Sequence, residues 1–264
     1  MSGDAGARDN ERRLAMILEY DGTAYCGSQL QENGPSIQGE LERAINNLTG
    51  EAARVAFAGR TDAGVHALGQ VAAFDTRSRL GPAEFARGLN HFLPEDIAVQ
   101  RAIDAPAGFD PRRDAQGRLY RYRIANRARR SPLERNRAWH VGRPLDAGAM
   151  LGAARRLEGA HDFAAFAGAY ESSTRRTLRR CDVVATGESV VLEMEAQAFL
   201  PHQVRRTAGA LVEVGLGRMT EESLVVLLDA ARPASAGPTA PPCGLYLVSV
   251  AYDGLGLEPC RRDG

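Results

Sequence analysis

Lysine is absent from this chain of 264 residues, so every basic side chain other than histidine is an arginine. The absence excludes a Schiff-base lysine, a Walker-type phosphate loop and the catalytic lysine of kinases. Arginine is suited to bidentate contacts with phosphate and to stacking on nucleobases. Chemistry that needs an amine side chain is therefore excluded, whereas binding of a polyanion is not.

Cysteine is also scarce: four residues are scattered along the chain, and no two of them form a Cys-x-x-Cys pair. The five histidines show no metal-ligand spacing. These patterns argue against a zinc site and a disulfide framework. No window approaches the ~18 apolar residues of a membrane span, and the polar N-terminus lacks the apolar core of a signal peptide. We expect a cytoplasmic protein with no metal, no membrane association and a disordered tail at residues 1–12.

The formal net charge is zero, but the arginines are unevenly distributed. Ten of them lie between Arg112 and Arg137, where the acidic residues are Asp114 and Glu134. Shorter basic clusters lie at residues 175–180 and 205–206. A neutral protein with one basic face can bind a polyanion. A solvated, charged surface explains the same distribution, so the arginines alone leave both interpretations open.

The first half of the chain has the pattern of a split βαβ motif. Apolar periodicity and capping residues predict a strand at 14–19, a helix from Ser36 to Gly50, two strands flanking residue 62, a helix at 83–92 opened by Pro82 and a strand at 97–103. This order is β-α-β-β-α-β. We assign it to an N-terminal domain at residues 13–111.

The second half repeats this order approximately. The predicted elements are a strand at 119–124, a helix capped by Asp146 that reaches 157, strands at 177–185 and 189–198, helices at 202–214 and 221–231, and a strand at 245–252. We assign residues 112–264 to a C-terminal domain. The predicted fold is α+β, with two pseudo-symmetric split-βαβ halves of the RRM or ferredoxin-like kind, joined side by side around a central active-site cleft.

The most informative motif is Gly-Arg-Thr-Asp-Ala-Gly-Val-His-Ala at residues 59–67, between two apolar, strand-like segments. Glycines permit positive φ and a close approach of backbone to ligand, so this short connection can present Asp62 to a substrate. Asp and Gly are also favoured in hairpin turns, where the carboxylate bonds its own backbone. Taken alone, the motif fits both a turn and a catalytic loop.

One marked carboxylate, with neither a metal pattern nor a general-base histidine, indicates a reaction that uses the carboxylate as nucleophile or proton acceptor. Burial would raise the pKa of such a carboxyl group, and a nearby guanidinium would oppose that rise. Arg205, near the start of a predicted helix, is the candidate guanidinium, although an exposed helix arginine is the commoner case. Tyr120 and Tyr122 lie on the same face of their predicted strand. An aromatic ring beside basic residues, such as Tyr120, can stack on a nucleobase. For Tyr122, packing in the core is the better explanation.

These residues resemble the TruA family of tRNA pseudouridine synthases, and the similarity covers most of the chain. Residues 59–67 look like the family signature, and Arg-Leu-Tyr-Arg-Tyr-Arg-Ile at 118–124 resembles the segment with the active-site tyrosine. A chance match would not reproduce seven motifs in one order. The other five are Tyr-Asp-Gly-Thr at 20–23 with Gly27 and Gln-Leu-Gln at 29–31, Asn90 with Leu-Pro-Glu-Asp-Ile at 93–97, Gly-Ala-His-Asp-Phe at 159–163 with Phe166, Phe199 and Leu200 with Val204, Arg205 and Gly209, and Gly-Leu-Tyr-Leu at 244–247.

The resemblance implies isomerisation of uridine to pseudouridine at positions 38 to 40 of the tRNA anticodon arm. Asp62 would be the essential catalytic carboxylate, acting as a nucleophile on the sugar or the base, or by proton removal along a glycal route. Tyr120 would stack on the flipped-out uracil, and Arg205 would pair with Asp62. Arg60 would contact the RNA backbone or hold the flipped nucleotide, and Arg118 would also contact the substrate.

The resemblance also implies partners. The arginine clusters would bind phosphates of the tRNA anticodon stem-loop and would recognise its shape more than its sequence. Nothing is oxidised or hydrolysed overall, so no cofactor is expected. Members of the family are homodimers, and we expect the same of this chain.

Three positions depart from the family pattern. Ser28 stands where the family often has Trp, Asp110 where His is common, and Pro201 where an aromatic residue or His is usual. None of them coincides with an expected catalytic residue, so activity is still expected. Contacts with the substrate near these positions are expected to differ.

Two other functions compete with this interpretation. A non-catalytic RNA-binding protein built on two RRM-like halves would be expected to carry the aromatic-rich RNP1 pattern, which is absent from the chain. A carboxylate-dependent glycosidase would need two carboxylates that flank the scissile bond, and the sequence marks only Asp62. Both functions therefore rank below the synthase.

Overall fold

The computed structural model describes residues 11–32, 34–168, 172–230 and 232–257. These residues divide into two compact units, one from Met1–Gln116 with Ser249–Gly264 and one from Gly117–Val248. The division lies close to the predicted boundary at residue 111, but the chain from Ser249 onward groups with the first unit. Most of the predicted tail, residues 1–12, lies outside the described residues, and Arg12 is the first residue of a strand.

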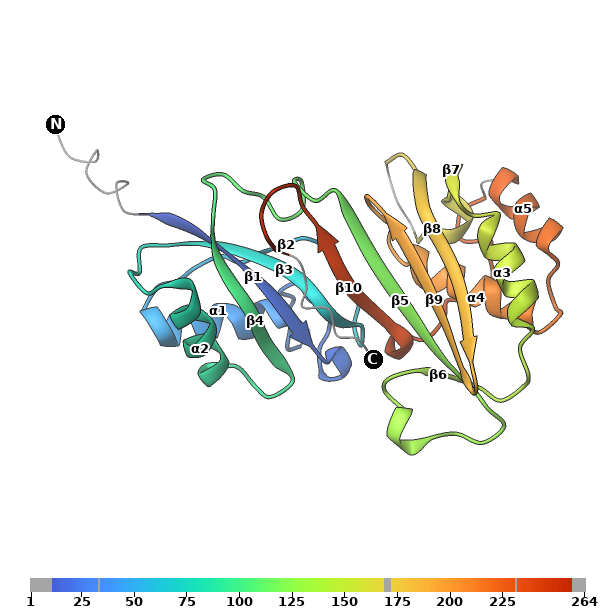
Figure 1. Ribbon diagram of the computed structural model, residues 1–264, viewed down its shortest axis with the longest axis horizontal. Coiled ribbons are helices and arrows are strands. Elements are labelled where there is room, and N and C mark those ends of the chain that lie inside the picture. The colour runs from blue at the N-terminus through green and yellow to red at the C-terminus, as the bar shows by residue number, and fades with distance from the viewer. Residues whose placement is uncertain (1–10, 33, 169–171, 231, 258–264) are drawn as a thin grey trace. The chain divides into compact units, whose positions relative to one another are not determined.

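The first unit is a mixed α/β layer (Figure 1). Strand β1 is central: β3 pairs with one of its edges and β4 with the other, and β2 pairs with β3, always antiparallel. Helix α2 packs against β4 and α1. The elements are β1 (Arg12–Tyr20), α1 (Ile37–Thr49), β2 (Ala56–Phe57), β3 (His66–Thr76), α2 (Pro82–Phe92) and β4 (Ile97–Ala105), with a short 3-10 helix at Gly22–Ala24.

Local capping fixes the two helices of this unit where the sequence predicted them. The Ser36 hydroxyl accepts a hydrogen bond from the Gly39 N–H, and Gly50 ends α1 in the left-handed conformation at φ 76°. Pro82 is the first residue of α2, as its fixed φ and missing N–H favour. The apolar faces of both helices are buried, and Phe85 of α2 meets Phe74 of β3 edge to face at 5.8 Å. Both predicted helices are therefore confirmed.

The second unit is also mixed α/β (Figure 1). Its strands follow the order β10-β5-β9-β8-β7, and β6 pairs with β5 in parallel. Helix α3 packs on β8 and α4, and α4 contacts β5. The elements are β5 (Gly117–Asn126), β6 (Trp139–Val141), α3 (Ala147–Arg155), β7 (Gly159–Asp162), β8 (Arg175–Thr186), β9 (Ser189–Ala196), α4 (Gln203–Gly215), α5 (Glu221–Ala230) and β10 (Leu245–Ala251), with 3-10 helices η2 (Pro132–Glu134), η3 (Ala164–Phe166) and η4 (Pro242–Gly244). The part of β10 from Ser249 onward belongs to the first unit.

The second unit differs from the sequence prediction chiefly in two short strands and one helix end. Strands β6 and β7 were not predicted, because segments of three and four residues are too short to display a period of two. Helix α3 ends at Arg155 rather than at residue 157, since Leu157 donates its N–H to the Ala154 carbonyl and tightens the last turn into 3-10 geometry. None of the helices in the described ranges is long and apolar enough to cross a bilayer.

Candidate active site

Asp62 lies on the connection between β2 and β3, and its side chain is half-buried. Gly64 takes a positive φ of 75° at the turn, and the Val65 N–H donates to the Asp62 carbonyl at 3.2 Å. The Gly64 N–H donates to the Tyr25 carbonyl at 3.3 Å. The connection is therefore a closed turn attached to the rest of the first unit. We call residues 59–65 the Asp62 loop.

Ser28 holds the residue just before Asp62 through two hydrogen bonds. Its N–H donates to the Thr61 carbonyl at 3.1 Å, and its hydroxyl oxygen accepts from the Thr61 N–H at 2.9 Å. Ser28 is fully buried, so water does not compete for these bonds. This role was not predicted from the sequence, where Ser28 stood out only as a departure from the family pattern.

A buried hydrogen-bond chain supports the same loop from the strand side. The Tyr20 hydroxyl pairs with the Thr61 hydroxyl at 2.9 Å, and the Gln70 amide donates to the Tyr20 oxygen at 3.4 Å and to the Gly59 carbonyl at 2.8 Å. Burial raises the pKa of Tyr20 from 10.0 to about 12, and the hydrogen bonds from Thr61 and Gln70 oppose part of that rise. Tyr20 is therefore a neutral phenol at pH 7.

Two glycines of the N-terminal motif let the backbone approach the Asp62 loop closely. A Cβ on Gly22 would lie 1.9 Å from the Val65 carbonyl oxygen. Gly27 has a φ of 112°, and a Cβ there would lie 2.7 Å from the Thr61 carbonyl oxygen. A side chain at either position would push the loop away, which explains in physical terms why this motif contains glycine.

The Leu-Pro-Glu-Asp-Ile motif joins the same assembly through Asp96. Its carboxylate accepts from the Tyr25 hydroxyl at 2.5 Å, and its carbonyl accepts from the Asp21 N–H at 2.9 Å. Burial raises the pKa of Tyr25, and the hydrogen bond to Asp96 and its negative charge raise it further. Three segments that are distant in sequence therefore meet around the Asp62 loop within the first unit.

Tyr120 lies on β5 of the second unit, opposite Met194 of β9. Its side chain is buried, with a relative exposure of 8%, and its ring meets Phe199 edge to face at 5.1 Å. Tyr122, two residues further along the same strand face, is completely buried, and its hydroxyl donates to the Pro241 carbonyl at 2.7 Å. Core packing, the interpretation preferred for Tyr122, is confirmed.

Arg205 lies in the first turn of α4 and is half-buried. Its Nε donates to the Ala240 carbonyl at 2.9 Å, and the Ala240 N–H donates to the Arg205 carbonyl at 3.1 Å. Burial raises the pKa of both the Tyr122 phenol and the Cys243 thiol, and the charge of Arg205 counteracts part of each rise. The guanidinium is therefore positioned near the tyrosine strand by a main-chain contact.

The residue before α4 is conformationally strained. His202 has a φ of 60° and acts as the N-cap, so the helix begins at Gln203, one residue later than predicted. A left-handed conformation at a residue other than glycine costs about 1–3 kcal/mol and is commonest at functional sites. The Gln203 side chain then accepts the Leu200 N–H at 2.8 Å, in place of a conventional cap. The strained backbone at His202 supports the prediction that the start of α4, which carries Arg205, belongs to a functional site.

The two remaining predicted residues have different surroundings. Arg60 is exposed on the Asp62 loop. Arg118 on β5 has a relative exposure of only 7%, and its guanidinium donates to the Gln197 carbonyl. The first unit thus contains Asp62 and Arg60, and the second contains Tyr120, Arg118 and Arg205. Over the residues that the structure describes, no cluster of three or more His, Cys, Asp or Glu side chains could hold a metal ion.

Comparison with known proteins gives consistent results. The family model described as tRNA pseudouridine synthase matches residues 16–112 and 153–253. The chain is 48% identical to "tRNA pseudouridine synthase A" of Myxococcus xanthus over 256 residues, which covers 96% of each chain. Proteins of the same name from Geotalea uraniireducens and Rhodopseudomonas palustris are 46% and 48% identical over 91% of this chain and 100% and 99% of their own lengths.

The matched ranges include some of the candidate residues and leave out others. Asp62, Arg60 and Arg205 lie within them. Tyr120 and Arg118 lie in the stretch between the two ranges, as does most of the arginine-rich segment.

Proposed function

The chain belongs to the tRNA pseudouridine synthase family and is an isomerase, and on this premise we propose that it converts uridine to pseudouridine at positions 38 to 40 of the tRNA anticodon arm. Asp62 is the catalytic carboxylate in this proposal. The observation that carries it is the construction of the Asp62 loop. Thr61 is fixed by a buried hydrogen bond to Ser28 and Gly64 by a main-chain hydrogen bond to Tyr25, while the Asp62 carboxylate itself stays half-buried.

The proposed reaction needs one group that can act at the reacting atoms. The N1–C1′ bond of the uridine breaks, the uracil turns, and a C5–C1′ bond forms. C5 loses its proton and N1 gains one, so atoms and charge balance without an oxidant or a hydrolytic water. A carboxylate held rigidly in position can serve as the nucleophile in this sequence.

The other residues have supporting roles in the proposal. The target uridine must leave the base stack, because a stacked base hides the atoms that react. Tyr120 stacks on the flipped uracil, Arg205 pairs with Asp62, and Arg60 contacts the RNA backbone. Arg118 has the least direct role, because its guanidinium is buried and donates to the Gln197 carbonyl. We propose that it acts on the substrate by orienting the chain around Gln197.

The proposal extends to fold and partners. The strand orders β4-β1-β3 with β2 on β3, and β10-β5-β9-β8, support two pseudo-symmetric split-βαβ halves. The names of the relatives support tRNA as the substrate. We propose that the anticodon stem-loop is the part recognised, that the enzyme works as a homodimer in the cytoplasm, and that it needs no cofactor.

The experiment maps the modified position. Four tRNA transcripts are incubated with the enzyme: three keep uridine at only one of positions 38, 39 and 40, and the fourth has no uridine there. We expect pseudouridine at the single retained uridine in the first three transcripts and none in the fourth. Pseudouridine elsewhere in the tRNA, at equal yield in all four, would contradict the proposal.

A further inference from the structure

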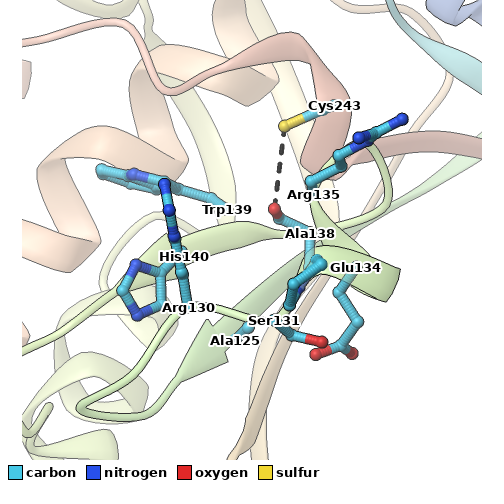
Figure 2. A pocket seen from close by; sticks show the side chains of 10 residues that line it. Ala125, Arg130, Ser131, Glu134, Arg135, Ala138, Trp139, His140 and Cys243 are labelled. Atoms are coloured by element: carbon cyan, nitrogen blue, oxygen red, sulfur yellow. Dashed lines mark hydrogen bonds between the residues drawn. The ribbon is translucent and has the colours of Figure 1, made fainter.

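A recess lies in the second unit, on the segment that follows β5. It has a volume of about 560 Å³ and is lined chiefly by η2, β6 and the residues beside them (Figure 2). The side chains of Arg130, Arg135, Trp139 and His140 contribute to its wall, and so does Cys243, whose thiol donates to the Ala138 carbonyl at 3.7 Å. The size falls within the range of small-ligand sites, about 300–1,000 Å³.

Arg130 and Arg135 of this recess differ from Arg121 and Arg127 of the same unit. Within the described part of the chain, neither Arg130 nor Arg135 forms an ion pair, and both are exposed. By contrast, Arg121 pairs with Glu193 at 2.8 Å and Arg127 with Glu188 at 3.4 Å. The one lining carboxylate, Glu134, faces Arg123 at 3.8 Å. The recess therefore has positive charge available for an anion.

An aromatic surface stands beside this charge. Trp139 is half-buried, and its ring meets Tyr122 edge to face at 6.3 Å and 88°. Since Tyr122 is itself fixed by its bond to Pro241, the indole is held in place at one edge. His140 bonds the Arg127 carbonyl through Nε2 at 2.8 Å, so that nitrogen carries a hydrogen. Charge and ring together match a nucleotide, with its phosphate and its base face.

The match to the family model does not assign a function to this recess. Nine of its ten lining residues lie between the two ranges matched by the family model, and only Cys243 falls inside one. Cys243 is also the residue whose thiol experiences the charge of Arg205. The recess therefore adjoins the candidate arginine of the active site without sharing a predicted site residue.

We propose that this recess binds one nucleotide of the tRNA other than the target uridine, with its phosphate on Arg130 and Arg135 and its base against Trp139. The inference rests on the proposed function, since it requires an RNA substrate whose bases can be exposed. An anticodon loop offers such bases, because its unpaired nucleotides can be splayed and stacked on aromatic rings. The recess would contribute to affinity and to orientation of the arm, and it would take no part in the chemical step.

The chain carries its own reporter for this site, because Trp139 is its single tryptophan. Tryptophan fluorescence is followed as unmodified tRNA is added to the full-length protein, and binding is measured in parallel by filter retention. We expect quenching whose midpoint equals the filter-binding Kd, together with protection of the indole from iodide. Saturating tRNA that leaves the fluorescence and the iodide access of Trp139 unchanged would overturn the proposal.

A free nucleotide is the other source of the same chemistry. Uridine and adenosine 5′-monophosphates are titrated under the same conditions. Quenching by tRNA at concentrations far below those needed for either monophosphate supports the proposal. Quenching by a monophosphate while tRNA has no effect assigns the recess to a free nucleotide and contradicts it.

Charge-matched variants separate this recess from general attraction of RNA. Arg130→Ala/Arg135→Ala is compared with Arg79→Ala/Arg87→Ala, because all four arginines are exposed and form no ion pair within the described residues. The first pair should raise the KM for tRNA about tenfold, leave kcat unchanged and lower the slope of log affinity against log salt by about 1–2. Equal losses of tRNA affinity in both double variants would indicate general electrostatic attraction of RNA and overturn the proposal.

The two proposals can fail independently. If the transcripts show pseudouridine at 38 to 40 and tRNA leaves Trp139 unaffected, only the recess proposal fails. If tRNA quenches Trp139 and modification occurs elsewhere in the tRNA, the proposed target fails and the recess stands.

Discussion

The Asp62 loop and the basic segment at residues 127–143 are constructed in opposite ways. Around the loop, buried main-chain hydrogen bonds from Ser28 and two close glycine contacts fix the backbone to within narrow limits. In the basic segment, Arg130 and Arg135 are exposed, and Leu133 between them is 92% exposed. One region is specified by buried geometry, and the other presents exposed arginines, of which Arg130 and Arg135 form no ion pair within the described residues.

The difference suits the two regions to separate tasks, the chemical step for the Asp62 loop and RNA binding for the basic segment. A reacting group must be held within a fraction of an ångström, so its surroundings are buried and rigid. A contact with phosphate tolerates more movement, since the attraction is long-range and acts on shape. We therefore expect changes around the Asp62 loop to alter the rate of the chemical step, and changes in the basic segment to alter affinity and salt dependence.

The largest effect is expected from Asp62→Asn. Loss of the carboxylate should lower kcat by about 10³-fold or more, because a group of this kind acts in the chemical step itself. The affinity for tRNA, measured by filter retention, should change by less than about threefold, since an isosteric amide leaves the RNA contacts in place. Asp104→Asn, which breaks a surface pair with Arg12, is the control and should retain full activity. Parallel loss of affinity and rate would place Asp62 among the binding residues.

Arg205→Ala should come next. We expect kcat to fall about 10²-fold, as for removal of other electrostatic contacts at a reacting group, with little change in KM. Arg206→Ala removes the neighbouring charge, whose guanidinium bonds the Ala234 carbonyl, and should leave kcat nearly unchanged. Steady-state kinetics on both variants gives the comparison. Similar losses in kcat and in affinity for Arg205→Ala would contradict its assignment to Asp62.

Ser28→Ala tests whether the loop is held for catalysis or for stability alone. The variant loses the acceptor of the Thr61 N–H, so the loop should shift and kcat should fall about tenfold. Ser36→Ala is the matched control, since it removes the buried cap of α1 and should lower the free energy of unfolding by about 1 kcal/mol. Its kcat per folded molecule should stay at the wild-type value. If both variants lose stability and neither loses kcat, the Ser28 contact is only structural.

The smallest effect concerns the buried phenol behind the loop. Because the pKa of Tyr20 is raised to about 12 in the folded protein from 10.0, the neutral phenol stabilises the fold fully below pH 10, and this contribution is lost as the pH rises towards 12. Tyr20→Phe should make the fall in unfolding free energy between pH 10 and 12 shallower by about 1.4 kcal/mol per pH unit. Urea titrations across this range measure the slope. An unchanged slope would show that Tyr20 does not resist ionisation in the fold.

Much of the fold could be predicted because its signals are local. Ser36, Gly50 and Pro82 mark helix ends within a few residues of the elements they terminate. The active-site candidates could be predicted only partly. Asp62 was marked by its flanking glycines, and Arg205 and Tyr120 by motif order, whereas the Ser28 contact joins residues 33 positions apart and has no local signature.

The basic segment shows a second limit of prediction from sequence. Its charge was visible in the sequence, but the recess was not, because it depends on the parallel pairing of Trp139 with Ile124 of β5. A three-residue strand within arginine-rich sequence has too little periodicity to predict that pairing. The sequence thus indicated an affinity for polyanions without indicating a shaped site.

The most direct test of this division is single-turnover tritium release from tRNA that contains 5-tritiated uridine, with enzyme in saturating excess. Wild type, Asp62→Asn and Arg130→Ala/Arg135→Ala are compared in one experiment. We predict release at the wild-type rate from the double arginine variant, because saturation removes its deficit in affinity, and release slower by about 10³-fold or more from Asp62→Asn. Release from Asp62→Asn at the wild-type rate, or its loss from the arginine variant at saturation, would contradict the account.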